Sequence, residues 1–181
     1  MIYLFRIISD ENPNFHRDLV SDGSDTFLDF HKVLQEDLGY DASQLASFFI
    51  CNENWEKQQE ITLIDMMQDP GVETLTMEAV TLEEYLVGLN QRMIYVFDFF
   101  SERAFFIELI ELSDQQSRRQ TPFVADAKED PPPQLALDKL LDDVNLDEAA
   151  YEDEDEENPG SDLRIDDLDP DMFEAGNPED Y

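Results

Sequence analysis

Two β-rich segments separated by three polar residues dominate the sequence between Ile94 and Leu112, IYVFDFFSERAFFIELIEL. Branched and aromatic side chains favour extended strands, and Ser101–Arg103 has the length of a hairpin turn. Alternation gives the first segment two largely apolar faces, one with Met93, Tyr95, Phe97 and Phe99 and the other with Ile94, Val96, Asp98 and Phe100. Because such a strand has to be covered on both sides, we predict a central antiparallel hairpin with strands Met93–Phe100 and Ala104–Leu112.

Strand and helix signals alternate in the chain before this hairpin. Strands are predicted over residues 2–8 and 15–20, near 44–51 and over 73–80. Apolar residues at helical spacing predict a helix from Phe27 to Leu38, after a loop whose last residue, Asp25, can cap it, and Gly39 then provides a left-handed stop. The capping-box pattern Thr81–Glu84 predicts a second helix to about Leu89. We therefore expect a small α+β domain with a mixed or antiparallel sheet and packed helices.

The composition changes after residue 115 and divides the chain into four parts. Residues 1–115 form the predicted domain, and residues 116–134 a polar linker stiffened by Pro131–Pro133. Residues 135–150 are predicted to hold an amphipathic helix with an apolar face of Leu137, Leu140, Leu141 and Val144. Residues 151–181 have the composition of a disordered acidic tail, because like charges in a row cannot collapse, here Glu152, Asp153, Glu154, Asp155, Glu156 and Glu157.

The formal net charge is −34, from 45 acidic and 11 basic residues. Residues 126–181 hold 22 acids and 3 bases, and residues 1–125 hold 23 acids and 8 bases, so both parts are acidic. Contacts to a nucleic-acid backbone need clusters of Lys and Arg, whereas the longest basic cluster is Arg118–Arg119, so direct nucleic-acid binding is not expected. A basic protein partner would be attracted, including the basic groove of a nucleic-acid enzyme.

The order of these segments resembles a bacterial and archaeal family named after a plasmid open reading frame, the plasmid pRiA4b ORF-3-like family, also labelled an insertion-element passenger protein family. The resemblance covers about residues 15–112. It rests on a tyrosine-rich strand that ends in an aspartate and an aromatic residue, Tyr95–Phe99, and on a helix pattern of Leu28, His31, Gln35, Gly39 and Tyr40. It implies a small α+β domain and assigns no biochemical activity.

The chain departs from the family pattern after this strand. Where the family continues with glycine, aspartate, tryptophan and histidine, this sequence has Phe100, Ser101, Arg103 and Phe105. Gln44 stands nearest the place of a further histidine. Most polar residues of any site at this hairpin are therefore missing from the sequence. The resolvase-like label implies recombination, but the sequence shows no nucleophilic serine amid arginines that grip DNA.

Asp98 is the carboxylate inside the apolar hairpin, and the sequence allows two roles for it. As a general base or ligand it would profit from burial beside aromatic side chains, which raises a carboxyl pKa. Its partner would be Glu102, Glu108, His31 or His16, and the sequence fixes none of their distances. As a structural residue it would accept hydrogen bonds from backbone N–H groups of the turn. The structural role is favoured, since a single carboxylate without a placed partner is a weak catalytic signal.

No cofactor and no metal site are predicted. With two His and one Cys, a tetrahedral zinc site would need distant carboxylates, and Cys51 has no nearby His to activate it as a nucleophile. Asp167–Asp171 is similar to the start of a calcium loop, but Met172 and Pro178 replace the required glycine and glutamate. A cytoplasmic protein is expected, because a lone cysteine fits a reducing compartment and no apolar run approaches the roughly 20 residues that span a bilayer.

The sequence thus favours a non-enzymatic interaction or regulatory module over an enzyme. In this hypothesis the acidic tail binds or shields a basic protein partner as a mimic of nucleic-acid charge. The predicted partner-binding residues are the leucine-rich face from Leu137 to Val144 and the acidic run from Glu152 to Glu157. The alternatives are a small enzyme that uses Asp98 in acid–base chemistry, and a domain whose acidity serves only solubility or salt adaptation. The oligomeric state stays open.

Overall fold

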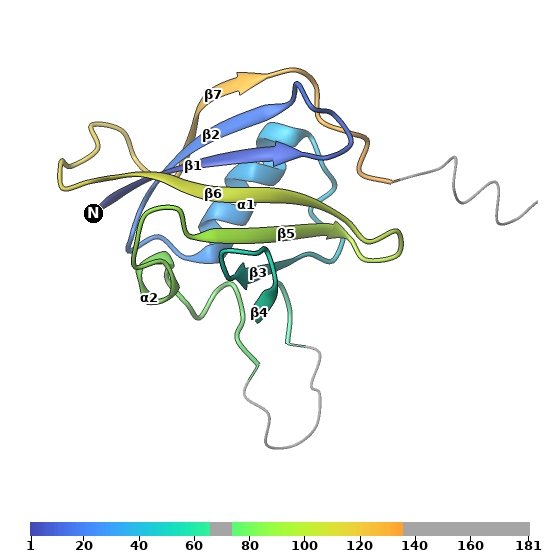
Figure 1. The fold of residues 1–181 in the computed structure, drawn as a ribbon, viewed down its shortest axis with the longest axis horizontal. Helices are drawn as coiled ribbons and strands as arrows, with labels where there is room; N and C mark the ends of the chain where they lie inside the picture. Colours follow the sequence, from blue (N-terminus) through green and yellow to red (C-terminus); the bar gives the residue numbers. More distant parts are fainter. Residues whose placement is uncertain (66–73, 136–181) are drawn as a thin grey trace, which may run out of the picture. The chain divides into compact units, whose positions relative to one another are not determined.

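Seven strands form an antiparallel sheet in the order β4-β3-β5-β6-β1-β2-β7 (Figure 1). The structure, a computed structural model, describes residues 1–65 and 74–135, which belong to one unit, Met1–Leu140. The strands are β1 (Ile2–Ser9), β2 (His16–Asp22), β3 (Ser47–Cys51), β4 (Lys57–Thr62), β5 (Arg92–Asp98), β6 (Arg103–Ser113) and β7 (Phe123–Lys128). The strands predicted over residues 2–8 and 15–20 are confirmed as β1 and β2, which pair with each other, Phe5 opposite Leu19.

The predicted central hairpin is formed by β5 and β6. Their register pairs Met93 with Ile107 and Tyr95 with Phe105, and each strand has a further neighbour, β3 beside β5 and β1 beside β6. Both faces of β5 are buried, since Tyr95 lies in the main core and Ile94 in a second, smaller cluster on the opposite face. The prediction is confirmed, and its physical reason is that a strand with two apolar faces lies inside a sheet.

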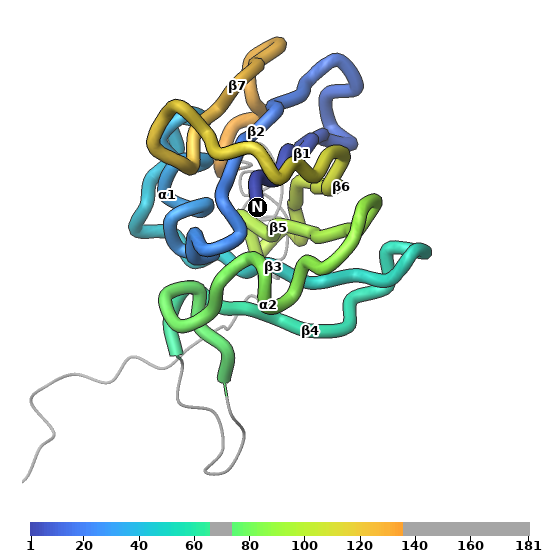
Figure 2. Tube along the Cα trace, turned by 90° about the vertical axis from the view of Figure 1, so that its left-hand side faces the viewer, coloured from blue at the N-terminus to red at the C-terminus, as the bar shows by residue number. Residues whose placement is uncertain are grey.

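Helix α1 (Phe27–Leu38) lies along one side of the sheet (Figure 2). The ring of Phe30 packs edge-on against Phe5 of β1 and Phe48 of β3, with ring centroids 5.1 and 5.6 Å apart. These three side chains are fully buried, so the aromatic contacts between α1 and the sheet form the centre of the main core.

The ends of α1 follow from local chemistry. Thr26 is the N-cap, one residue later than predicted: its hydroxyl accepts a hydrogen bond from the Asp29 N–H, and the Asp29 carboxylate accepts one from the Thr26 N–H. Asp25 instead accepts hydrogen bonds from the Ser21 hydroxyl and the Asp22 N–H. Gly39 ends the helix as predicted, at φ 67°, a left-handed conformation that costs glycine little.

The second helix, α2 (Leu82–Tyr85), is shorter than predicted. Its capping box forms, since the Glu84 carboxylate accepts hydrogen bonds from the Thr81 N–H and hydroxyl, but the chain leaves the helix well before Leu89. The strand predicted over residues 73–80 is also wrong in the described part, where Thr76 makes only an isolated bridge. The sheet therefore dominates the fold, and the predicted packed helices reduce, in the described residues, to one of 12 and one of 4 residues.

The predicted linker over residues 116–134 is corrected by the structure, because β7 lies within it and pairs with β2. The domain therefore does not end at residue 115. Four of the six side chains of β7 are exposed, so the strand lacks the apolar alternation by which strands are recognised, as expected at a sheet edge. At its end, Nη1 of the buried Arg17 donates hydrogen bonds to the carbonyl oxygens of Lys128 and Glu129 at 3.0 Å. Among residues 1–65 and 74–135, no helix combines the length and apolarity needed to cross a membrane.

Candidate functional site

The family-pattern residues of α1 and β5 meet in a buried hydrogen-bond network. Gln35 Nε2 donates to the Tyr95 hydroxyl at 2.6 Å, and the same hydroxyl lies 2.8 Å from His31 Nδ1. The Tyr95 hydroxyl thus lies between the two helix side chains, and the tautomer of His31 decides which of Tyr95 and His31 donates in their hydrogen bond. The network joins the helix to the centre of the sheet.

This network is structural rather than a ligand site. Tyr95 is fully buried, and His31 and Gln35 are each 3% exposed, so a ligand in solvent has no access to them. Burial, with a smaller contribution from Lys32, lowers the pKa of His31 to about 4, and burial raises the pKa of Tyr95. Both groups are thus held neutral, as their hydrogen bond requires. The prediction of His31 as a partner of Asp98 finds no support in these contacts.

The corner after α1 fastens the segment that follows β7. The Tyr40 hydroxyl donates to the carbonyl oxygen of Pro132 at 2.5 Å, and its ring lies against Phe97 and Phe105. Burial raises the pKa of Tyr40, which keeps the hydroxyl protonated as a donor. Tyr40 therefore acts in the family pattern as an anchor for the chain near residue 132.

The contacts of Asp98 match the structural role that the sequence favours. It is 9% exposed, and its Oδ1 accepts hydrogen bonds from the N–H groups of Phe100 and Ser101 at 3.0 and 3.1 Å. Its Oδ2 lies 3.8 Å from Arg103 Nη1. Among the described residues, the four partners expected for a catalytic Asp98 make no hydrogen bond to it. The carboxylate closes the β5–β6 turn.

Arg103 is a buried residue that the sequence did not single out as important. Its Nε and Nη2 donate to the two carboxylate oxygens of Glu11 at 2.8 and 2.9 Å, and its Nη1 donates to the carbonyl oxygen of Gln134 at 3.2 Å. The Gln134 side chain in turn bonds both the N–H and the carbonyl of Asp41. An arginine beside an apolar strand is a signal for such a buried ion pair, but sequence does not identify the partner.

A second group of titratable side chains lies on β2 and β7. His16 Nε2 is 2.8 Å from Asp126 Oδ2, and Asp18 accepts two hydrogen bonds from Arg6 at 2.8 and 2.7 Å. One ligand atom from each of His16, Asp18 and Asp126 lies within 4.8 Å of the others. The hydrogen bond from His16 lowers the pKa of Asp126. Because a cation would have to displace Arg6 from Asp18, these contacts are ion pairs of the sheet edge and do not favour a metal site.

The apolar surface at the β5–β6 tip is the candidate functional site. Phe99 and Phe100 were predicted to be buried on the two faces of the hairpin, and this is wrong, since they are 46% and 80% exposed. The reason is the turn: Asp98 accepts hydrogen bonds from the N–H groups of Phe100 and Ser101, so the chain leaves the sheet at Asp98 and carries both rings outward.

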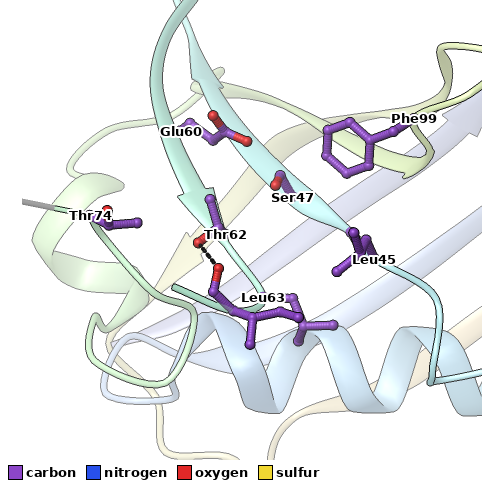
Figure 3. A pocket seen from close by; sticks show the side chains of 9 residues that line it. Leu45, Ser47, Glu60, Thr62, Leu63, Thr74 and Phe99 are labelled. Atoms are coloured by element: carbon purple, nitrogen blue, oxygen red, sulfur yellow. Dashed lines mark hydrogen bonds between the residues drawn. The ribbon is translucent and has the colours of Figure 1, made fainter. Parts of the chain in front are cut away.

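Phe99 lines two hollows. The first has a volume of about 250 Å³ and lies between the tip and the end of β4 (Figure 3), lined by Leu45, Ala46, Ser47, Glu60, Thr62, Leu63, Ile64, Thr74 and Phe99. The second has a volume of about 230 Å³ and is lined by Lys57, Ile94, Val96, Phe99, Glu102, Ala104 and Phe106. We name Phe99, Phe100, Leu45, Ile64 and the two hollows the tip surface.

The tip surface combines exposed apolar groups with a mainly acidic rim. Leu45 and Ile64 are 43% and 53% exposed, and Figure 3 shows Leu45 and Phe99 on the same side of the first hollow. The Thr62 hydroxyl donates to the Ile64 carbonyl oxygen at 2.9 Å, which fixes the chain at the hollow's edge. Glu60 lines the first hollow and Glu102 the second, both exposed. Such a surface fits an apolar side chain carried by a basic segment.

The sequence-predicted partner-binding residues do not take part in this description. Leu137, Leu140, Leu141 and Val144, and the acidic residues Glu152, Asp153, Glu154, Asp155, Glu156 and Glu157, lie outside the described residues. The same holds for the predicted amphipathic helix beyond residue 135 and for the predicted disorder of residues 151–181. Those predictions remain predictions.

Comparisons with known proteins identify the family from a family model and a similar fold from a solved structure. The model of the family described as plasmid pRiA4b ORF-3-like protein matches residues 2–175, which extends well beyond the resemblance seen over about residues 15–112. Among solved structures, the crystal structure of a protein of unknown function from Methanosarcina mazei Go1 is similar, with a TM-score of 0.58 and 18% identity over 80% of this chain and 81% of that one. At this identity the likeness shows the fold alone. None of the curated proteins compared matches the chain.

Proposed function

Since the chain belongs to the plasmid pRiA4b ORF-3-like protein family, which carries no assigned activity, we propose its function from its own charge and surface: it is a non-enzymatic interaction module that binds or shields a basic protein partner. The observation that carries this proposal is the acidity of the folded part. Residues 1–65 and 74–135 hold 24 acids and 9 bases.

Many of these few bases are already engaged within the fold. Arg6 is paired with Asp18, Arg17 with Asp37 and Arg103 with Glu11. Two further cations lie over aromatic rings, Lys57 over Phe49 and Arg92 over Trp55. Each ion pair neutralises one acid with one base, so the described part keeps a net charge of −15 (9 bases against 24 acids), while few bases stay available for phosphate groups. This balance favours a basic protein over a nucleic acid.

The acidic run of the C-terminal part adds long-range attraction in this proposal. Residues 136–181 hold 19 acids and 2 bases, with the highest density from Glu152 to Glu157. Such a charge accelerates encounter with a basic partner and mimics the charge of a nucleic acid, while the leucine-rich face from Leu137 to Val144 provides apolar contacts. We further propose a cytoplasmic location, on the basis of the single cysteine.

The contacts of Asp98 support the non-enzymatic proposal over the enzymatic alternative. A general base needs a carboxylate that a substrate can reach, whereas Asp98 is only 9% exposed. Its Oδ1 accepts from two turn N–H groups, and its Oδ2 lies 3.8 Å from Arg103 Nη1. Its removal would therefore open the turn rather than abolish a chemical step.

The test is affinity capture from native lysate with the full-length chain and a variant in which Glu152–Glu157 are replaced by Gln and Asn. The matched control neutralises six scattered acids instead, Asp147, Asp162, Asp166, Asp169, Asp171 and Glu179. Both variants lose the same charge, so only the clustering differs.

We expect the wild-type chain to capture basic proteins that salt releases, the cluster variant to capture about tenfold less, and the control to retain most of the capture. Equal capture by the wild type and the cluster variant would contradict the role of the run. If the captured proteins were not basic, or if acidity only stabilised the fold in salt, the interaction proposal itself would fail.

A further inference from the structure

We infer that the tip surface is a docking site for a basic segment of the partner, which inserts an aliphatic or aromatic side chain beside Phe99. This inference rests on the proposed function and adds to it the place of contact on the folded domain. It assigns the acidic run to attraction and the tip surface to recognition.

The turn places residues 99 and 100 outside the sheet, but no contact of the described fold explains why both are aromatic. Five positions before Phe100, Tyr95 is fully buried, whereas Phe100 is 80% exposed and Phe99 nearly half exposed. Exposed aromatic side chains are costly in water, and clusters of them on a soluble domain mark interaction sites. The turn itself is held by Asp98 and does not need aromatic residues after it.

The shape beside Phe99 suits an anchor residue rather than a flat contact. The two hollows of about 250 and 230 Å³ share Phe99 as a wall, so an inserted side chain would contact its ring. The floor of the second hollow is apolar, with Ile94 and Val96 almost fully buried beneath it. An apolar anchor in a hollow surrounded by a polar rim is the usual form of a binding hot spot.

The charge at the rim selects the chemistry of the occupant. Glu60 and Glu102 are exposed on the two hollows, and the cation of the rim, Lys57, lies 4.2 Å from the centroid of the Phe49 ring. An acidic occupant would meet these carboxylates and the net negative charge of the domain. Lys or Arg next to the anchor would instead pair with them, so the occupant is a basic segment.

The test uses full-length protein and three short synthetic peptides, because the partner is unidentified. The first contains only Leu and Lys, with Leu along one face. The second replaces Leu with Ser at the same charge, and the third replaces Lys with Glu at the same apolar content. Affinity is measured by calorimetry, and the contact is mapped by chemical-shift changes. We expect the first peptide to bind and to shift signals of Leu45, Glu60, Ile64 and Phe99, and the other two to bind at least about tenfold more weakly.

Two matched pairs of variants locate the site. Phe99→Ser should weaken binding of the Leu–Lys peptide about tenfold or more. Val87→Ser should leave this affinity unchanged, because the Val87 side chain is 82% exposed but lines neither hollow. Glu60→Gln with Glu102→Gln should weaken it and make binding less salt-sensitive. Glu111→Gln with Asp114→Asn removes the same charge from exposed positions at and beyond the far end of β6 and serves as the control.

Three results would overturn the inference. Equal affinity of the wild type and Phe99→Ser for the Leu–Lys peptide would show that Phe99 does not form the anchor site. Tighter peptide binding in the double variant Leu137→Ser, Leu140→Ser would show that the chain's own leucine-rich segment covers the tip surface. Self-association of the wild type that is lost in Phe99→Ser would show that a second copy of the chain binds the tip surface. Wild-type peptide affinity in Phe99→Ser together with loss of capture by the Glu152–Glu157 variant would reject the tip site and leave the proposed function standing. Equal capture by that variant together with weaker peptide binding in Phe99→Ser would do the reverse, so the two failures are distinguishable.

Discussion

Strand β5 and the turn that follows it hold aromatic residues in opposite environments. Tyr95 is buried and bonded to His31 and Gln35 of α1, whereas Phe99 and Phe100, just beyond the end of the strand, project into solvent. The two regions differ because of Asp98, which ends the sheet pairing by bonding the turn. Aromatic content alone therefore does not distinguish core from surface: in the first region it stabilises the fold, and in the second it is available for binding.

The largest expected difference between the two regions is in stability. Phe30→Ala should lower the free energy of unfolding by about 3–5 kcal/mol, because a fully buried ring between Phe5 and Phe48 would leave a cavity. Urea unfolding followed by the fluorescence of Trp55, the one tryptophan of the chain, measures it. The matched change at the tip, Phe100→Ala, should cost less than about 0.5 kcal/mol. Equal losses of unfolding free energy in the two variants would show that the tip contributes to stability as much as the core.

The next effect concerns the contacts that hold the base of the tip. Arg103→Met keeps the apolar stem but leaves Glu11, the Gln134 carbonyl and Asp98 without their cation, so we expect a loss of about 2–3 kcal/mol, reduced from a fully buried pair because Glu11 is 38% exposed. Arg6→Met, which breaks an exposed pair with Asp18, should cost at most about 1 kcal/mol. Similar unfolding midpoints for the two variants would contradict the anchoring role of Arg103.

The buried network gives the protein a specific dependence on pH. The pKa of His31 is about 4 in the folded chain against an ordinary value of 6.5. Below pH 6.5 the unfolded chain binds a proton that the folded chain excludes, so the contribution of His31 to the free energy of unfolding falls as the pH drops from about 6.5 to 4, by at most about 1.4 kcal/mol per unit. That contribution is fully present above pH 6.5.

Unfolding measured between about pH 7 and pH 5 tests this contribution. His31→Asn should lower the slope by the contribution of His31, while His16→Asn, in the partly exposed pair with Asp126, leaves His31 in place and should retain that contribution. Parallel pH profiles for wild type and His31→Asn would mean that His31 titrates normally in the folded chain.

The smallest expected effect lies in the turn itself. Asp98→Asn retains an oxygen that accepts the N–H groups of Phe100 and Ser101, and it loses only the charge near Arg103, so about 1 kcal/mol should be lost. Asp98→Ala removes both and should cost roughly twice as much. Hydrogen exchange at the Phe100 and Ser101 amides should rise in Asp98→Ala and stay near wild type in Asp98→Asn, and the reverse order would contradict the turn role.

The parts of the fold that local periodicity determines were predictable. The apolar faces of Met93–Phe97 required a central strand, and Gly39 marked the end of α1. The end of that strand was not predictable, because alternation continues through Phe99 and Phe100 in the sequence and only the hydrogen bonds of Asp98 show where the sheet stops. Sequence patterns describe which face a residue would occupy, but not where the strand ends.

Contacts between distant segments explain the other differences. The seventh strand escaped prediction because an edge strand such as Phe123–Lys128 needs few apolar side chains. His31 and Tyr95 are 64 positions apart, so no local sequence pattern indicates that their side chains form a hydrogen bond. For the same reason the two hollows of the tip surface, which join residues of β4, β5 and the segment before β3, could not be recognised from the sequence.

The central claim is that the exposed aromatic tip serves binding and not stability, and one variant tests both parts. Full-length Phe99→Ser is compared with the wild type for urea unfolding and for affinity toward the Leu–Lys peptide. The account predicts a change of less than about 1 kcal/mol in the free energy of unfolding together with an affinity loss of about tenfold or more. A large loss of stability with unchanged affinity would contradict it, because Phe99 would then belong to the core rather than to a docking surface.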